Sequence, residues 1–260
     1  MQAFLIGLQF LTRIRVANQT IWTEEDFGKS VRFFPLVGAV LGCIYGAVAW
    51  LLCCQLPQWG IFPPRSLSLV ILLILPVVLT GGIHCDGFMD TMDGVFSGRS
   101  PERILEIMKD SRVGSFGVVS FVLLMITQYS ALSDVPASEL PWAVFVMPVI
   151  ARFMMVLAIT EYPYARKQGM GKAFSMYASR PVLGWVALYS VLLIAIGGYS
   201  ALLALAFSYL FTRYFCGYVT RLIGGLTGDV YGAVCTLCEL VVLLSFILGS
   251  YLLGRGIICI

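Results

Sequence analysis

Long apolar segments are the feature of this sequence that most restricts its fold. An α-helix needs about 20 consecutive apolar residues to cross the hydrocarbon core of a bilayer. The 260 residues are 59% hydrophobic and 12% charged, whereas soluble domains are usually about 45–50% apolar and about 25% charged. We therefore predict an all-α fold, a polytopic transmembrane helix bundle in which residues 1–260 form a single domain. The predicted spans, about seven, are 33–54, 66–82, 114–132, 142–161, 181–197, 200–216 and 233–253.

The first 16 residues, MQAFLIGLQFLTRIRV, are apolar but are not typical of a signal peptide. Their positive charges follow the apolar stretch, and no small-residue cleavage site is evident. Phe4, Leu5, Leu8 and Leu11 share one helix face. We therefore expect an N-terminal helix that lies in the membrane interface.

Charge and cysteine content exclude some functions. The net charge of +3 is too small to indicate a nucleic-acid partner. The eight cysteines are scattered, and the CxxC pair Cys235 and Cys238 has no second pair. We expect small buried thiols there rather than a zinc or redox site.

The basic residues predict the orientation, because lysine and arginine collect in cytoplasmic loops. With a cytoplasmic N-terminus, the outer side keeps only Arg65 and Arg255, and Arg152 lies within a span. This bias predicts the N-terminus inside and the C-terminus outside. The other 14 of the 17 basic residues fall on the inner side: Arg13, Arg15, Lys29, Arg32, Arg99, Arg103, Lys109, Arg112, Arg166, Lys167, Lys172, Arg180, Arg213 and Arg221.

Two glycine series predict close helix contacts. Small residues four positions apart let helix backbones approach each other in lipid. One series is Gly38, Gly42 and Gly46, and the other is Gly224, Gly228 and Gly232.

Three aspartates stand at the predicted cytoplasmic end of the second span, in GGIHCDGFMDTMDGVFSG. Asp86, Asp90 and Asp93 are spaced i, i+4 and i+7, so a helix carries all three carboxylates within a narrow arc. Like charges so close repel one another, and a divalent cation would offset that repulsion. Oxygen ligands alone favour Mg²⁺, Mn²⁺ or Ca²⁺ over zinc. The alternative is a solvated acidic helix end.

The next segment, SPERILEIMKDSRVGSFG, combines acidic and basic side chains. Ser100 before Pro101 predicts a helix start. Acidic metal ligands beside basic phosphate-binding groups are typical of phosphoryl transfer; an interfacial helix with ion pairs is the alternative. The acidic residues are Glu102, Glu106 and Asp110, and the basic ones are Arg103, Lys109 and Arg112.

Other catalytic motifs are missing from the sequence. GMGKAF, at 169–174, lacks the upstream glycine of a P-loop, and no serine stands in a GxSxG turn. His84 is the only histidine, so a histidine-rich metal site is excluded by count. Its position beside Asp86 makes it a candidate substrate contact, or simply a polar residue at a helix end.

Three further charged residues are candidates for substrate binding. Arg152 lies in the middle of a span, where an ionisable residue indicates function; it would bind substrate phosphate or pair with an acidic group. Asp229 and Glu239 flank the cytoplasmic start of the last span. Each would help to bind metal, base or sugar, or would cap and pair within the bundle.

These motifs together resemble the cobalamin synthase family, the adenosylcobinamide-GDP ribazoletransferases. GGIHCDGFMDTMDG and ERILEIMKDSRVGSFG carry the specific part of the likeness. It extends over nearly the whole chain in order, through FLTRIRV, FFPLVGAVLG, ARFMMV and GGLTGDVYGAVCTLCEL. No acidic position departs from the pattern.

The resemblance implies a late step of vitamin B12 biosynthesis. In that family, adenosylcobinamide-GDP reacts with α-ribazole or its 5′-phosphate, giving adenosylcobalamin or its phosphate and GMP. It also implies Mg²⁺ as cofactor and the bacterial inner membrane as location. The charge bias and the position of the aspartates predict an active site that faces the cytoplasm. The chemistry parallels that of CDP-alcohol phosphotransferases. The sequence leaves oligomeric state, homo-oligomer included, open.

The expected mechanism gives these residues three tasks: metal binding, phosphate binding and proton transfer. Asp86, Asp90, Asp93 and Asp110 would hold one or two Mg²⁺ ions against the pyrophosphate. Lys109 and Arg112 would bind the remaining phosphate oxygens. Asp93 or Asp110 would accept the proton of the attacking ribazole hydroxyl.

Two rival functions remain at this stage. A cation transporter predicts acidic residues near mid-membrane, whereas these cluster at the inner end. A lipid-type CDP-alcohol phosphotransferase has an Ala-Arg pair soon after its first Asp-Gly, whereas Asp86-Gly87 leads here to Met89-Asp90.

Overall fold

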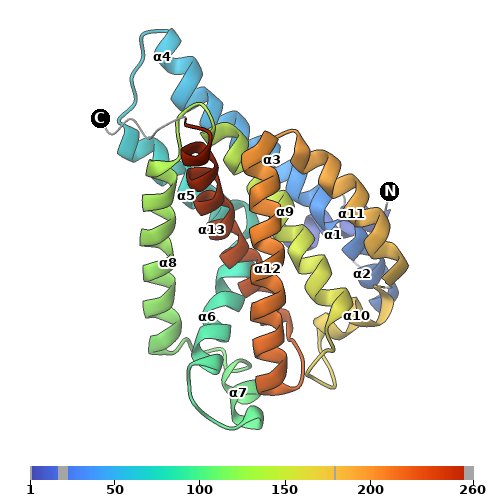
Figure 1. Cartoon of the computed structure of the whole chain (residues 1–260). Coiled ribbons are helices and arrows are strands. Elements are labelled where there is room, and N and C mark those ends of the chain that lie inside the picture. The colour runs from blue at the N-terminus through green and yellow to red at the C-terminus, as the bar shows by residue number, and fades with distance from the viewer. Residues whose placement is uncertain (1, 17–22, 179, 255–260) are drawn as a thin grey trace.

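The computed structural model describes residues 2–16, 23–178 and 180–254, and the regular elements in that part of the chain are all helical (Figure 1). The predicted all-α class is therefore confirmed. In chain order the elements are α1 Gln2–Leu11, α2 Glu24–Ser30, η1 Val31–Phe33, α3 Phe34–Trp50, η2 Leu51–Gln55, α4 Leu56–Gln58, α5 Arg65–Thr80, α6 Ile83–Val95, α7 Pro101–Ile107, α8 Ser115–Asp134, α9 Leu140–Glu161, α10 Met170–Tyr177, α11 Arg180–Ala195, α12 Gly198–Ile223 and α13 Gly228–Leu252.

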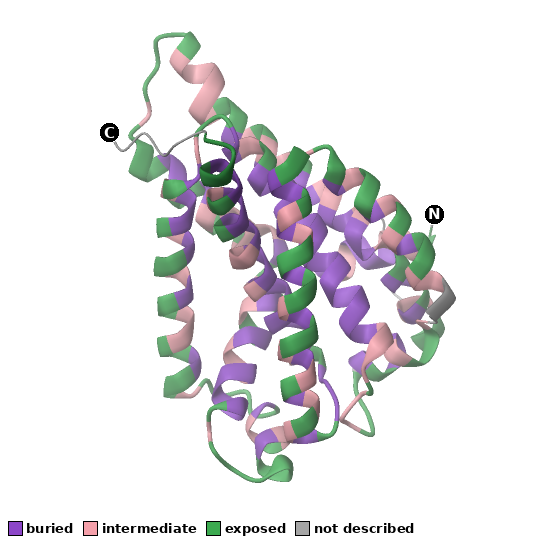
Figure 2. Ribbon diagram, in the orientation of Figure 1, coloured by how far each residue is buried: buried purple, intermediate pink, exposed green. Residues whose placement is uncertain are grey.

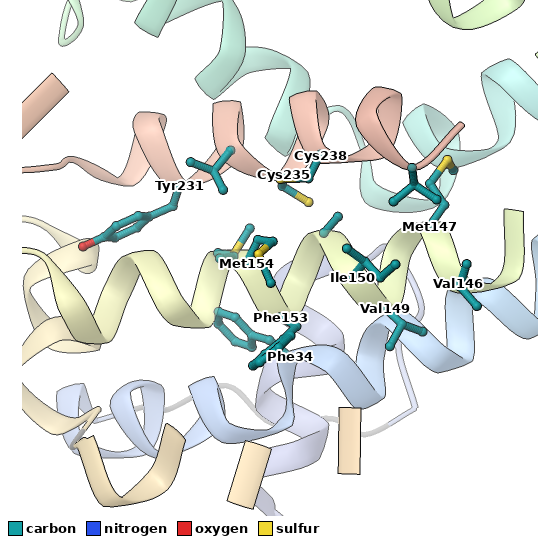
Figure 3. Packing of buried hydrophobic residues seen from close by; sticks show 14 of the residues in the cluster. Phe34, Val146, Met147, Val149, Ile150, Phe153, Met154, Tyr231, Cys235 and Cys238 are labelled. Carbon is teal, nitrogen blue, oxygen red and sulfur yellow. The ribbon is translucent and has the colours of Figure 1, made fainter. Parts of the chain in front are cut away.

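Helix α9 forms the centre of the bundle, between α3 and α13 (Figure 3). Almost every residue in its middle is buried, and Figure 2 shows the helix purple there, whereas α8 exposes one of its faces. A helix that is apolar all round belongs in the interior of a larger assembly of helices. The first glycine series explains how close the neighbour comes: Gly38 and Gly42 of α3 lie against the backbone of Pro148 and Phe145. That predicted packing role is confirmed.

The second glycine series was predicted to make close helix contacts, and one of its three members does so. Gly224 ends α12 with a left-handed backbone (φ 80°), and Gly228 begins α13. Only Gly232 packs against another helix, where it meets His84 and Gly87 of α6. The glycines serve a tight connection between two helices, which spacing alone did not reveal.

Helical segments long and apolar enough to cross a membrane number five in the described residues, and up to seven if each bent pair counts as one span. The bent pairs are α5 with α6, at 91°, and Gly171–Tyr177 with Val182–Ala195, at 101°. The seven predicted spans thus require both pairs. The five are Glu24–Gln58, Ser115–Asp134, Leu140–Glu161, Gly198–Ile223 and Gly228–Leu252; the last two are longer than predicted.

The loops sort to two ends of the bundle (Figure 1). The connections around α7, before α10 and between α12 and α13 lie at the lower end, whereas α4 and the turns at 135–139 and 196–197 lie at the upper end. The lower end holds part of the predicted inner set of basic residues, around α7, before α10 and near the end of α12; the orientation in the membrane stays a prediction. Helix α1 buries Ile6, Leu8 and Leu11 against the bundle; its place in a membrane interface stays a prediction.

Most cysteines in the described part of the chain are buried or half-buried free thiols. Cys235 and Cys238 are buried and free on α13, as expected. Cys259 and Arg255 fall outside the described residues.

Candidate active site

A glycine pair between α5 and α6 sets up the site. Gly81 and Gly82 both have left-handed backbones, with φ of 66° and 75°. Glycine adopts this conformation without the steric cost that a side chain imposes. The two helices therefore meet at 91°, and α6 turns into the bundle instead of continuing the line of α5.

Helix α6 has one buried face and one acidic face. His84, Phe88, Met92 and Val95 recur at helical spacing and are buried, and the helix packs against α13 and α8. The aspartates lie on the opposite arc, because residues four and seven apart share a face. The sequence thus predicted the acidic face correctly, although the bend that points it inward was not foreseen.

Two of the aspartates are available for a ligand. Asp86 is exposed and Asp90 is half-buried, and neither carboxylate makes a hydrogen bond or ion pair with any residue in the described ranges. Asp90 feels the charges of Asp86, Asp93 and Asp229 and the opposite charge of Arg166. Like charges held this close cost free energy unless a cation offsets them.

Asp229 joins these carboxylates from the start of α13. Its backbone lies directly against Gly87, where a side chain on α6 would collide with it. Its Oδ2 accepts a hydrogen bond from the Thr227 hydroxyl (3.1 Å) and lies 2.9 Å from a terminal nitrogen of Arg166. The sequence left open whether Asp229 binds metal or substrate or only caps its helix. The structure places Asp229 at the acidic cluster itself.

Arg166 is held beside this cluster by a connection between two loops. The Ala165 amide donates to the Leu226 carbonyl and the Leu226 amide donates to the Pro163 carbonyl, each at 2.8 Å. Gly225 permits the approach, because an added side chain would meet the backbone of Pro163 and Ala165. The loop before α10 is therefore fixed against the loop before α13.

The guanidinium of Arg166 has unused hydrogen-bonding capacity. Its Nε and Nη2 are buried and donate no hydrogen bond, although Nη2 lies within ion-pair distance of Asp229. Buried donors without acceptors cost free energy. An anion with several oxygens, such as a phosphate, would satisfy them.

Asp93 lies on the same arc but has different partners. Its two oxygens accept hydrogen bonds from the Gly114 amide (2.7 Å) and the Gly117 amide (2.8 Å). These amides belong to the N-terminus of α8, whose orphan donors and dipole favour a carboxylate. Asp93 thereby fastens α6 to α8; its predicted roles as metal ligand and base remain predictions.

The predicted helix after Ser100 is present but short. Helix α7 begins at Pro101 as predicted and ends at Ile107, so Asp110 lies beyond it. Asp110 is exposed and accepts from Arg112 through the backbone amide and the guanidinium. Hydrogen bonds from Arg112 lower the pKa of Asp110 to about 2. Glu106 forms an ion pair with Arg103 at 2.7 Å, and Glu102 and Lys109 are exposed.

The structure brings this segment to α6 through its backbone, since the Gly114 and Gly117 amides donate to Asp93. Charged side chains of the segment pair with one another, Asp110 with Arg112 and Glu106 with Arg103. The roles predicted for Asp110, Lys109 and Arg112 therefore stay predictions.

Arg152 and Glu239 form a pair in the interior. Arg152 is fully buried, and its Nη1 lies 2.6 Å from Oε1 of Glu239. This is the structural pairing that the sequence offered as one of two alternatives. Arg152 Nε and Nη2 and His84 Nε2 are buried without hydrogen-bond partners. Arg152, Glu239 and His84 all line one small cavity, of about 30 Å³.

Two larger cavities meet at Asp86. One, of about 210 Å³, is also lined by His84, Asp229 and apolar side chains of α1, α9 and α10. The other, of about 570 Å³, is lined by the α5–α6 bend, Arg13 and Phe121. Asp86 therefore stands between two spaces that differ in size and polarity.

The donor set suits a magnesium ion that substrate completes. Mg²⁺ is commonly bound through one or two carboxylates together with substrate phosphates, not in an all-protein cage. No group of three metal-binding side chains is close enough to form such a cage in the described part of the chain. Asp86 and Asp90 of α6 and Asp229 of α13 lie near one another on two helices in contact, so one or two of them, completed by substrate phosphate, would supply the oxygen ligands of such an ion.

Arg166 and Thr227 are site residues that sequence reasoning missed. Arg166 was counted only as one of the basic residues that set orientation, and Thr227 was not singled out. The sequence carried a signal for Thr227, because a threonine two residues before an acidic first turn is typical of a helix N-cap. Nothing in the sequence placed Arg166 near α6.

Comparison with known proteins gives consistent matches. Residues 3–247 match the profile of a family described as cobalamin-5-phosphate synthase. The adenosylcobinamide-GDP ribazoletransferase of Desulfitobacterium hafniense (strain Y51) is 40% identical over 263 residues, which cover 96% of this chain and 97% of that protein. The protein of the same name from Clostridium acetobutylicum is 37% identical, with 96% and 97% covered. No solved structure matches the chain.

Proposed function

The chain belongs to the cobalamin-5-phosphate synthase family, as its motifs predicted, and from this membership we propose its substrates and mechanism. It is a membrane transferase of cobalamin biosynthesis. The donor is adenosylcobinamide-GDP. The acceptor is α-ribazole or its 5′-phosphate, and the products are adenosylcobalamin, or its phosphate, and GMP.

One observation carries the proposal: α6 presents two carboxylates without hydrogen-bond partners among the described residues, beside an Asp229–Arg166 ion pair at the start of α13. Asp86 and Asp90 come from α6, Asp229 comes from α13, and Arg166 lies 2.9 Å from Asp229. Phosphoryl transfer depends mainly on positioning and on neutralising phosphate charge. Acidic groups for a metal and a guanidinium for phosphate oxygens supply both.

The residues divide the work as follows. Asp86, Asp90 and Asp229 would hold Mg²⁺, which supplies neutralisation of the charge on the pyrophosphate oxygens. Arg166 binds phosphate oxygens through its guanidinium, whose buried Nε donates no hydrogen bond and whose Nη2 forms an ion pair with Asp229. The Thr227 hydroxyl orients the Asp229 carboxylate.

The reaction forms one bond to phosphorus and breaks another. The acceptor hydroxyl oxygen attacks the phosphorus next to cobinamide, and the bond from that phosphorus to the bridging oxygen breaks, so that GMP leaves with the electron pair. The acceptor proton passes to a carboxylate. We assign this role to Asp86 or Asp90, since both Asp93 oxygens already accept amide hydrogens and Asp110 is paired with Arg112.

The location follows from the same arguments. We propose that the protein lies in the bacterial inner membrane, in contact with lipid, with the site open to the cytoplasm, because lysine and arginine collect in cytoplasmic loops and the loops around α7, before α10 and between α12 and α13 lie at one end of the bundle.

Purified protein in detergent tests the proposal. It should release GMP from adenosylcobinamide-GDP only when α-ribazole, or its phosphate, and Mg²⁺ are both present. Asp86→Asn and Asp90→Asn should abolish release while the protein remains folded. Release that needs no acceptor, or full activity in both variants, would reject the proposed reaction.

A further inference from the structure

The smaller cavity beside Asp86 has walls of one chemical kind. Phe10, Leu11, Met155, Ile159 and Phe174 give it an apolar lining. The aromatic rings belong to a larger group, since Phe174 also meets Phe10, Phe27 and Phe34 edge-on at centroid distances of 5.4, 6.0 and 5.6 Å. The wall is therefore rigid and suited to a flat ring.

The size of the cavity selects the ligand class. An apolar cavity of about 150 Å³ is large enough to take up benzene. This cavity, of about 210 Å³, has room for a somewhat larger aromatic ring system. It is far too small for a corrinoid or a nucleoside diphosphate.

Polar side chains also border this space. Asp86 and Asp229 of the acidic cluster line it, together with His84 and Tyr231. His84 lines the small cavity beside Arg152 as well. The apolar walls and the size of the space, with carboxylates at its border, therefore indicate an uncharged aromatic ring that is attached to a polar group.

We propose that the cavity lined by Phe10, Ile159 and Phe174 binds the uncharged heteroaromatic base of the acceptor nucleoside. This inference rests on the proposed function for the identity of the acceptor. It places the base in the apolar space and the sugar hydroxyl toward Asp86 and Asp229. The phosphate end of the donor then lies in the larger cavity of about 570 Å³ on the other side of Asp86.

This division suits the chemistry. Attacking and leaving oxygens lie roughly in line on opposite sides of the phosphorus that is transferred. Asp86 lines both cavities, so the phosphorus between the two substrates would lie near its carboxylate. The specificity for the acceptor base then comes from Ile159 and Phe174, which do not line the larger cavity.

Ile159→Phe tests the assignment by filling the cavity. It should raise the KM for α-ribazole about tenfold or more, a typical effect of altered volume in an apolar pocket, and leave the KM for adenosylcobinamide-GDP within about twofold. Ile126→Phe, at an exposed position of α8 (61% exposed), is the matched control. Equal changes in both KM values, or none, would overturn the proposal.

Benzimidazole, a flat two-ring base, gives a readout besides turnover. It should inhibit competitively against α-ribazole but not against adenosylcobinamide-GDP, and its binding in a calorimeter should weaken in Ile159→Phe and in Phe174→Leu. If the wild-type protein releases no GMP, the proposed function fails, and this binding measurement still decides the cavity. Binding that both variants leave unchanged contradicts the assignment.

Discussion

Substitution of Asp93 should affect stability much more than substitution of Asp90, although both lie on the acidic face of α6. Asp93 accepts two amide hydrogen bonds, at 2.7 and 2.8 Å, from the start of α8. Asp90 accepts none from the described residues and lies among like charges. The two positions therefore separate a structural carboxylate from a ligand-binding one.

The loss in the free energy of unfolding that we expect for Asp93→Ala follows from the hydrogen bonds that are lost. Loss of an N-cap side chain costs about 0.5–2 kcal/mol, and each hydrogen bond to a charged group contributes about 1.5–3 kcal/mol. Since these contributions overlap, we expect a loss of about 2–4 kcal/mol in the free energy of unfolding. Asp90→Asn should leave stability unchanged or raise it by a few tenths of a kcal/mol, because a like-charge i, i+4 pair with Asp86 is relieved.

Thermal unfolding in detergent at a fixed scan rate measures the difference. A change of 1 kcal/mol shifts the midpoint by about 2–4 °C in a chain of about 150–250 residues, so Asp93→Ala should lower it by roughly 4–16 °C. GMP release and nucleotide binding with and without Mg²⁺ are measured on the same preparations.

Exchanged outcomes in the two variants would contradict the structural role of Asp93 and the ligand-binding role of Asp90. A stable Asp93→Ala protein that has lost the effect of Mg²⁺ on nucleotide binding would make Asp93 a metal ligand, as the sequence first suggested. An Asp90→Asn protein that is strongly destabilised would give Asp90 a structural role.

Three further outcomes test other parts of the site. Arg166→Ala should weaken GDP binding without Mg²⁺ by about tenfold or more, since a hydrogen bond to a charged group contributes about 1.5–3 kcal/mol, and Arg166→Lys should restore part of it; unchanged binding would remove Arg166 from the phosphate site. Asp110→Asn should leave the acidic limb of the pH–rate profile in place, because the pKa of Asp110 is about 2, so it keeps its charge above about pH 4 and loses it only as the pH falls through about 2; a shifted limb would make Asp110 the base. Cysteine introduced at Ser100 in a cysteine-free background should react with an impermeant reagent only from the cytoplasmic side; labelling in intact cells would reverse the topology.

Much of the bundle could be predicted because membrane spans depend on local apolar length. Helices α8 and α9 begin and end within two residues of the predicted limits. The bend before α6 could not be predicted in the same way, because Gly81-Gly82 is compatible with a straight loop or a sharp turn. Only contacts with α13 and α8 fix its direction.

The site was predictable in its chemistry but not in its partners. Helical spacing alone puts Asp86, Asp90 and Asp93 on one arc. Which carboxylate remains available depends on amides 21 and 24 residues away in the chain. Arg166 comes to Asp229 across 63 residues through a loop connection, a tertiary relation that no local pattern contains.

The most direct test of the account is GMP release by purified Asp229→Asn protein compared with wild type, across a range of Mg²⁺ concentrations. If carboxylates of α6 and α13 share the metal that binds the donor pyrophosphate, wild type releases GMP in a Mg²⁺- and acceptor-dependent reaction. Asp229→Asn should then need much more Mg²⁺ or release none, with an unchanged thermal midpoint. Release by Asp229→Asn at the wild-type rate and Mg²⁺ dependence would contradict a site shared between the two helices.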